Sequence, residues 1–227
     1  MISNALRIST ARIVSGFAVV VISIMVLFIT PLARAQNSEE HKFNANVGVG
    51  VTPLVGDIST RLNTGWHITV GAGYNIAPSF GVDLEYMYTG LGVSQSALNA
   101  LDVPNGNAHV NSLTIDPIWR FKRGERFGAY VIVGGGYYRR TVEFTAPTTA
   151  VVDVFDPWWG YIGPVIVPVN QILGSVTTNA GGVNGGLGTT IDLGHGGIKF
   201  YGEIRYHYAA THRSRTQMLP ITFGVRW

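Results

Sequence analysis

Apolar and polar residues alternate one by one along most of the chain beyond residue 40. The final segment, LPITFGVRW, shows the pattern: large apolar residues occupy every second position across 219–227. A period of two places these residues on one face of a β-strand. Other segments alternate in the same way, although Ile118 interrupts the polar side of one of them. The pattern therefore predicts eight strands, at 43–51, 66–74, 80–88, 112–121, 127–137, 183–193, 198–208 and 219–227.

The aromatic residues indicate which face of these strands points outward. They stand at the strand ends of the apolar faces, whereas Val, Leu and Ile fill the middles. Two aromatic girdles around an aliphatic band are typical of outer-membrane barrels, whereas a soluble barrel places its apolar face inside. One girdle, on the expected periplasmic side, comprises Phe43, Tyr74, Phe80, Trp119, Phe121, Phe127, Phe200 and Trp227. The other comprises Trp66, Tyr86, Tyr88, Tyr137, Tyr206 and Tyr208.

The predicted fold class is therefore all-β, an eight-stranded antiparallel up-and-down transmembrane β-barrel. Connection lengths agree with this fold, since bacterial barrels have short periplasmic turns and longer outer loops. The expected short turns are 75–79, 122–126 and 194–197. The expected outer loops are 52–63, 90–109, 141–180 and 209–217.

The first 35 residues have the features of a secretory signal peptide. Arg7 and Arg12 precede an apolar run at 13–30, and the small-residue motif Ala33-Arg34-Ala35 follows it. Such a segment is cleaved during export. We expect a signal peptide at 1–35 and a barrel domain at 36–227. An uncleaved membrane anchor is the alternative, because the run is near the lower length limit of a spanning helix.

Composition and charge narrow the function classes. Hydrophobic residues make up 46% of the chain and charged residues only 13%, which argues against a disordered chain and an ordinary soluble globule. The net charge of +3 comes from three arginines in the first 35 residues, so the remainder is neutral and gives no case for nucleic-acid binding. The chain has no cysteine and its histidines are scattered, so we expect no metal site and no cofactor.

Strand parity also predicts the content of the lumen. Eight charged residues fall on the inward face, four acids and four bases: Asp83, Glu85, Asp116, Arg120, Lys199, Glu203, Arg205 and Arg226. Buried charges must pair, and an eight-stranded barrel is just wide enough to be filled by side chains. Inward glycines leave room for Tyr130, Tyr138 and Tyr201. The pattern favours a polar plug, with a narrow gated channel as the alternative.

The third outer loop, about 141–180, has the most individual sequence. Its prolines argue against a further pair of spanning strands. Trp158, Trp159 and Tyr161 form an aromatic cluster, which either folds over the barrel rim or contacts a surface ligand or partner. In the second loop, Ser94 or Ser96 is a candidate cap for a helix of one or two turns.

The chain resembles the eight-stranded outer-membrane β-barrel domain family, which contains the outer membrane protein A barrel and opacity-type proteins. The resemblance covers about residues 40–227 and is carried by GGVNGGLGTTIDL, KFYGEIRYHYA and PITFGVRW. It implies that the barrel-assembly machinery recognises the terminal strand, in which Trp227 stands where the family usually has Phe. These motifs are specific for architecture, and the family hosts several roles.

We therefore expect an integral protein of the bacterial outer membrane, with a structural, surface-contact or narrow-pore role and no catalysis. Its expected partners are outer-membrane lipid, the assembly machinery and an unknown surface ligand at the third outer loop. One alternative is a lipid A-modifying enzyme, because His212 and Ser214 are similar to the His-x-Ser pair of lipid A deacylases. A soluble ligand-binding β-barrel is the other alternative.

Overall fold

The computed structural model describes residues 42–121, 126–156, 158, 160–194, 197–210 and 215–227. The expected signal peptide lies outside these residues. No helix within the described ranges is long and apolar enough to cross a membrane.

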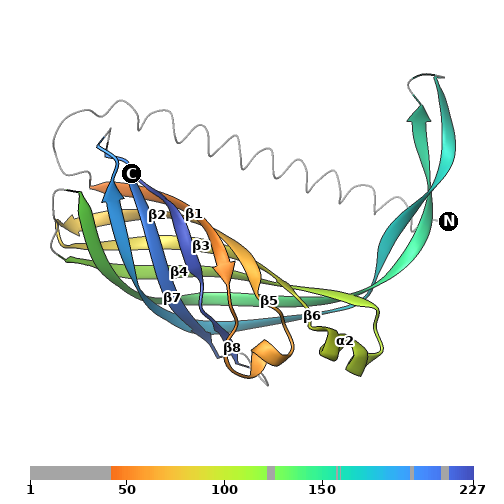
Figure 1. Ribbon diagram of the computed structural model, residues 1–227, viewed down its shortest axis with the longest axis horizontal. Coiled ribbons are helices and arrows are strands. Elements are labelled where there is room, and N and C mark those ends of the chain that lie inside the picture. The colour runs from red at the N-terminus through yellow and green to blue at the C-terminus, as the bar shows by residue number, and fades with distance from the viewer. Residues whose placement is uncertain (1–41, 122–125, 157, 159, 195–196, 211–214) are drawn as a thin grey trace. The chain divides into compact units, whose positions relative to one another are not determined.

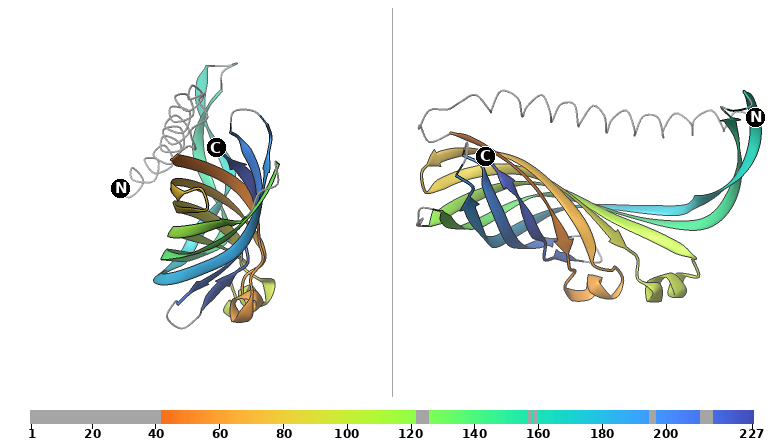
Figure 2. Two further views of the ribbon diagram at one scale, coloured as in Figure 1. Left: turned by 90° about the vertical axis from the view of Figure 1, so that its left-hand side faces the viewer. Right: turned by 45° about the horizontal axis from the view of Figure 1, so that its top comes forward.

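The described chain forms one antiparallel sheet that closes into a ring (Figures 1 and 2). Each strand from β1 to β7 pairs with the next along the chain, and β9 pairs with both β7 and β1, which closes the barrel. The strands are β1 (Phe43–Thr52), β2 (Gly65–Ala77), β3 (Phe80–Gly92), β4 (Asn105–Phe121), β5 (Phe127–Asp156), β6 (Tyr161–Asp192), β7 (Lys199–Ala209), β8 (Thr216–Met218) and β9 (Ile221–Arg226).

The eighth wall segment of the barrel consists of two strands, β8 and β9, which lie along the same side of β7. Pro220 lies in the gap between them, and proline cannot donate a hydrogen bond to a sheet. The sequence pattern predicted one continuous strand at 219–227. The structure therefore confirms eight wall segments but starts the last one at Thr216 and interrupts it at Pro220.

The ring closes with a fixed stagger between its first and last strands. Successive cross-strand pairs lead from Asn46 round the ring to Ala209 and then to Thr216. Asn46 itself pairs with Arg226 across the closing seam, ten residues further along the chain than Thr216. A stagger of this kind requires strands that tilt relative to the barrel axis, and it sets the barrel width together with the strand number.

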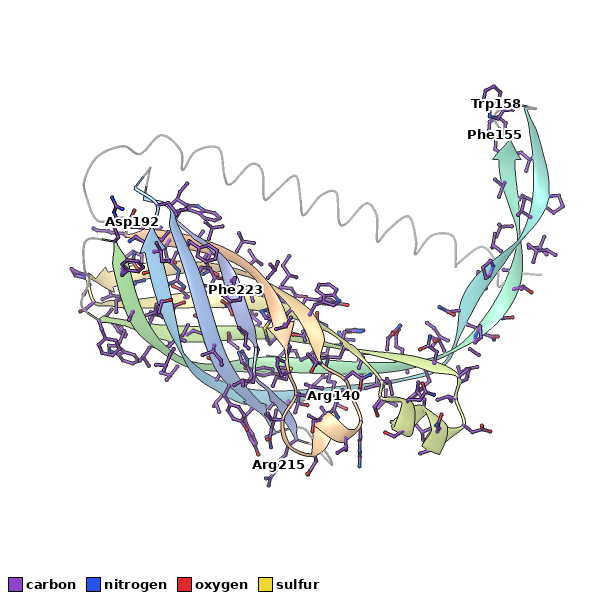
Figure 3. The ribbon with its side chains drawn as sticks, in the orientation of Figure 1. Arg140, Phe155, Trp158, Asp192, Arg215 and Phe223 are labelled. Carbon is purple, nitrogen blue, oxygen red and sulfur yellow. The ribbon has the colours of Figure 1, made fainter. Side chains whose placement is uncertain are left out.

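The outer surface of the barrel is apolar and the aromatic residues lie on it. All thirteen aromatic residues predicted for the girdles from β2 onward are exposed or half-buried, as is Phe43 of β1. Ring contacts form between neighbours within one predicted level, such as Phe43 with Tyr74 at a centroid distance of 5.2 Å and Trp66 with Tyr88 at 5.5 Å. Figure 3 shows Phe223 on the barrel wall. An exposed apolar belt of this kind is stable in lipid.

The two ends of the barrel differ in the length of their connections. One end of the barrel carries Asp192, and β1 begins and β9 ends there. The turns at this end are short, such as Pro78-Ser79. Arg140 and Arg215 mark the other end (Figure 3). Because short turns are periplasmic in bacterial barrels, we call the Asp192 end periplasmic and the other end outer.

Two short helices form in the outer connections. One is the 3₁₀-helix η1 (Gly56–Thr60), and the other is the α-helix α2 (Gln95–Leu101). The Ser94 side chain accepts a hydrogen bond from the Ala97 backbone N–H at 3.4 Å and caps α2, which confirms the short helix expected at Ser94. Ser94 also donates to the Thr60 carbonyl at 2.9 Å, so the first two outer connections are joined.

The third outer connection is a β-hairpin, which differs from the loop that the sequence indicated for 141–180. The β5–β6 ladder continues for eleven residue pairs beyond Thr145, from Ala146–Gln171 to Asp156–Tyr161. Pro164 and Pro168 lie within it. The strand edges are unpaired there, because β4 ends its pairing at Thr145 and β7 pairs no further than Gly182. Proline is tolerated at such edges, so its presence did not exclude strands. We call residues 146–156 and 161–171 the outer ribbon.

We expect Trp158 to lie outside the cell and Ser79 to face the periplasm. A single cysteine at Trp158→Cys should react with a membrane-impermeant thiol reagent in intact cells, because the chain has no other cysteine and Trp158 is highly exposed. Ser79→Cys, in the β2–β3 turn, should react only after the cells are opened. The reverse labelling pattern would show that the barrel has the opposite orientation.

Candidate functional site

Arg205 of β7 is the centre of a buried ion network in the lumen. Its guanidinium donates from Nη2 to Glu85 Oε2 at 2.9 Å and from Nη1 to Asp116 Oδ2 at 3.1 Å. Its Nε donates to Glu203. All four side chains are at most 5% exposed. Because they come from β3, β4 and β7, the network joins three parts of the barrel wall across its interior.

Neutral groups add hydrogen bonds to two of these carboxylates. Tyr130 donates to Glu203 Oε2 at 2.8 Å. Thr114 and Asn184 donate to the two oxygens of Asp116 at 2.7 and 2.8 Å. Such donors stabilise carboxylates that share one guanidinium, because an unsatisfied buried charge is costly.

A second ion pair lies beside this network. Arg226 of β9 donates from Nη2 to Asp83 Oδ2 at 3.1 Å. Its guanidinium carbon also lies 5.3 Å from the ring centre of Tyr130 and 5.5 Å from that of Tyr201. The Arg226 charge therefore makes cation–π contacts with two aromatic rings as well. Tyr130 therefore contacts both ion pairs, through its hydroxyl and through its ring.

The structure places the eight predicted lumen charges in two groups. Six are buried: Asp83, Glu85, Asp116, Glu203, Arg205 and Arg226. Arg120 and Lys199 are only half-buried, near the periplasmic ends of β4 and β7. The buried members among the described residues are thus four carboxylates and two guanidinium groups, and the balance of four acids and four bases stays a prediction. Parity gave the side of each strand correctly but not the depth along it.

Two buried histidines lie in the lumen beside the predicted charges. His67 lies between two threonines, with Nδ1 at 2.8 Å from Thr52 Oγ1 and Nε2 at 2.9 Å from Thr222 Oγ1. His207 Nδ1 lies 2.9 Å from the Tyr138 hydroxyl. Both histidines occupy inward positions, so the parity that located the charges would have located them too.

An apolar cluster fills the outer part of the lumen, and we call it the outer cap. Its side chains come from the first outer connection, α2 and the outer ends of the strands. Ile58 of η1 and Met218 of β8 are almost completely buried. The buried members are Leu54, Ile58, Leu62, Met87, Leu91, Val93, Leu98, Ala108, Val110, Tyr138, Ala209 and Met218. The lumen thus has a charged middle and an apolar outer end, and Tyr138 of the outer cap contacts His207 through its hydroxyl.

Inward glycines make the dense packing of the middle layer possible, as the sequence predicted. A Cβ at Gly188 would overlap the Tyr130 ring, and one at Gly48 would overlap the Tyr201 hydroxyl. These tyrosines fill the space that the glycines leave. Ile118, which interrupts the polar pattern of β4, packs in the lumen with Tyr130 and Ile132.

Of the predicted contact residues in the third outer connection, Trp158 lies at the far end of the outer ribbon (Figure 3). Trp158 is 90% exposed, so it does not pack onto the barrel rim. Trp159 and the side chain of Tyr161 lie outside the described residues, as do His212 and Ser214 of the enzyme alternative. The described residues contain no group of three or more His, Asp or Glu side chains arranged to hold a metal ion.

The closed ring, the apolar outer belt and the filled lumen define an outer-membrane β-barrel. Sequence comparison agrees: the family profile described as "Outer membrane protein beta-barrel domain" matches residues 21–226, and the chain belongs to this family. The family indicates the bacterial outer membrane as the location. No curated protein matches the chain by sequence.

Solved structures share the fold at low sequence identity. Neisserial surface protein A (NspA) aligns with a TM-score of 0.54 and 12% identity, over 82% of this chain and 96% of that one. A major outer membrane protein from Thermus thermophilus aligns with a TM-score of 0.52 and 13% identity, over 82% and 99%. The attachment invasion locus protein Ail of Yersinia pestis aligns at 0.46 and 13%, over 82% and 100%. At these identities the likeness concerns the fold alone.

Gly188→Ala should destabilise the barrel, because the new Cβ would push the Tyr130 ring away from Glu203 and Arg226. Overpacking of this kind costs about 1–3 kcal/mol. Gly202→Ala is the matched control on the lipid side of β7, where the nearest atoms belong to the edge of the Phe223 ring at 3.4 Å. Urea unfolding of both variants in lipid vesicles measures the difference. Equal midpoints would show that the Tyr130 packing is not tight.

Arg205→Met should lower the free energy of unfolding by about 3–5 kcal/mol, because it leaves three buried carboxylates without their shared cation. Glu203→Gln should cost less, since it removes one of three negative charges around Arg205. Arg139→Met, at an exposed position on β5, should change stability by only about 0.5 kcal/mol. The same urea titration compares them. A midpoint for Arg205→Met equal to that of the wild type would mean that the network does not stabilise the barrel.

Proposed function

We propose that this protein is a closed outer-membrane barrel that anchors the outer ribbon for contact with a surface or partner outside the cell, and that it has no catalytic role. The observation that carries the proposal is the outer ribbon itself. It continues for eleven residue pairs beyond the neighbouring strands and exposes large apolar side chains. Exposed apolar surface of this extent marks interaction sites.

The filled lumen supports a closed barrel over the narrow-pore alternative. The Arg205 network crosses the middle of the interior, and the outer cap occupies the path toward the outer end. An ion that crossed the cap would have to leave its hydration shell among apolar side chains, which is costly. Two barriers of different chemistry thus lie in series.

The positions of the buried histidines favour a non-catalytic role. A lipid-modifying enzyme must present its reactive groups to the lipid side of the barrel. His67 and His207 instead lie inside the lumen and contact threonine and tyrosine hydroxyls.

We include outer-membrane lipid and the barrel-assembly machinery as the partners of the barrel, and export through a signal peptide as its route. The apolar belt on the outer surface supports lipid as a partner.

The outer ribbon supports contact outward more than closure of the barrel. Both of its faces carry exposed apolar side chains: Val151, Phe155, Ile162 and Ile166 lie on one face, and Val152, Val154 and Val165 on the other. A segment that folded over the rim would bury at least one face. The ribbon is therefore available for contact.

Planar-bilayer recordings test the closed barrel and the role of the ribbon together. We expect the refolded protein to show no steady single-channel conductance, with an open porin as the positive control. A ribbonless variant, in which Asn-Gly replaces residues 147–170 and joins Ala146 to Gln171, should also stay silent and keep its heat-modifiable gel mobility. Steady conductance of the wild type would favour the pore alternative. Conductance of the ribbonless variant alone would show that the ribbon closes the barrel.

A further inference from the structure

The two edges of the outer ribbon differ in their capacity to bind another strand. An antiparallel ladder has two kinds of residue pair, which alternate along it. In the first kind the two residues direct their backbone N–H and C=O groups toward each other, and in the second kind both direct them away, to the outer edges. Pro164 and Pro168 have no N–H to give to β5, so their pairs belong to the second kind. Their partners across the ladder are Asp153 and Thr149. Alternate residues of each strand, in this register, therefore point their backbone groups to the outer edges.

The β6 edge of the ribbon is blocked. Its outward positions between 162 and 168 alternate between residues with an N–H, such as Ile166, and prolines, at 164 and 168. A strand added there would lose every second backbone donor. Proline on an exposed edge is a known means of preventing strand addition.

The β5 edge is open. Its outward positions 149, 151, 153 and 155 all keep their backbone N–H, and only Pro147 ends the series. No strand covers this edge in the described part of the chain, since β4 pairs with β5 no further than Thr145. The edge is rich in β-branched residues, with Val151 at 67% exposed, and Asp153 is the charged residue within 147–155. A long apolar edge of this kind readily pairs with another strand.

We propose that the open β5 edge pairs antiparallel with the same edge of a second copy of this chain, with the two-fold axis at Val151. This proposal rests on the proposed role of the ribbon in contact, and it names the partner. Position 151 is the middle of the outward series 147–155, since it lies four residues from both Phe155 and Pro147, which keeps only its C=O. In this register Asp153 lies opposite Thr149 of the second copy, so the two acidic residues do not face each other directly.

The edge asymmetry favours a second copy over a foreign strand. Each ribbon has one open edge, so a pairing of two open edges uses both of them and closes the assembly. The blocked β6 edges then form the outside of a four-stranded sheet, which cannot grow further. The chain thus supplies a partner of matching length and matching backbone pattern, and its prolines limit the product to a dimer.

Disulfide cross-linking tests the register, because the chain has no cysteine of its own. Val151→Cys places two thiols at the proposed two-fold axis, within the Cα separations that a disulfide allows. Ile166→Cys is the matched control. Ile166 is the cross-strand partner of Val151, on the same face and 70% exposed, but on the blocked edge.

Under mild oxidation in lipid vesicles, Val151→Cys should form covalent dimers at least about tenfold faster than Ile166→Cys, because thiols held together react far faster than thiols that collide. Equal rates would show random collision of ribbons and overturn the proposal. The absence of dimers from both variants would overturn it as well, and would leave a foreign strand or a lipid surface as the partner.

A second pair of variants measures the oligomeric state without cysteine. Val151→Pro removes the outward N–H at the axis, and the internal hydrogen bonds of the ribbon stay intact. It should convert the dimer to a monomer in analytical ultracentrifugation, whereas Ile166→Pro should remain dimeric. Heat-modifiable mobility confirms that both barrels are folded. A dimer that survives Val151→Pro would place the interface elsewhere. These measurements are independent of the bilayer recordings. Cross-linking and ultracentrifugation can therefore contradict the dimer while the recordings still support the closed barrel, and the reverse also holds.

Discussion

The structure depends on one constraint: inside a bilayer, every backbone N–H and C=O must find its partner within the protein. A sheet meets this constraint only if its first strand pairs with its last, as β1 does with β9. Closure with a stagger of ten residues fixes the width of the interior. The width in turn limits what the lumen can hold, because eight strands enclose a space just wide enough for side chains to fill.

The lumen shows how one narrow space can hold two kinds of packing. In the middle, carboxylates from several strands converge on Arg205, and tyrosine, threonine and asparagine complete their hydrogen bonds. Toward the outside, aliphatic side chains from the first two outer connections replace the polar groups. The first layer specifies which strands meet, because each charge has a defined partner. The second needs only apolar volume, which short loop helices supply.

Alternation along the chain was sufficient to predict the barrel and the inward side of the six buried charges, because a strand has only two faces. It did not give depth, so Arg120 and Lys199 were grouped with charges that lie deeper. It also did not predict the outer cap, since Leu54, Ile58 and Leu98 lie in loops without a simple period. The outer ribbon was missed for another reason. Proline excludes a central strand but not an edge strand, and the sequence does not show which strands have neighbours.

The seam between β1 and β9 has a consequence for the time course of folding. It joins residues far apart in the chain, such as Asn46 and Arg226, so the seam cannot form until the chain through β9 has been synthesised. Arg226 also supplies the partner of Asp83 and the cation held by Tyr130 and Tyr201. Until β9 is in place, Asp83, Tyr130 and Tyr201 lack the Arg226 side chain as their partner. Contacts of such high sequence separation fold slowly, which leaves the unfinished sheet exposed and makes a chaperoned route to the membrane advantageous.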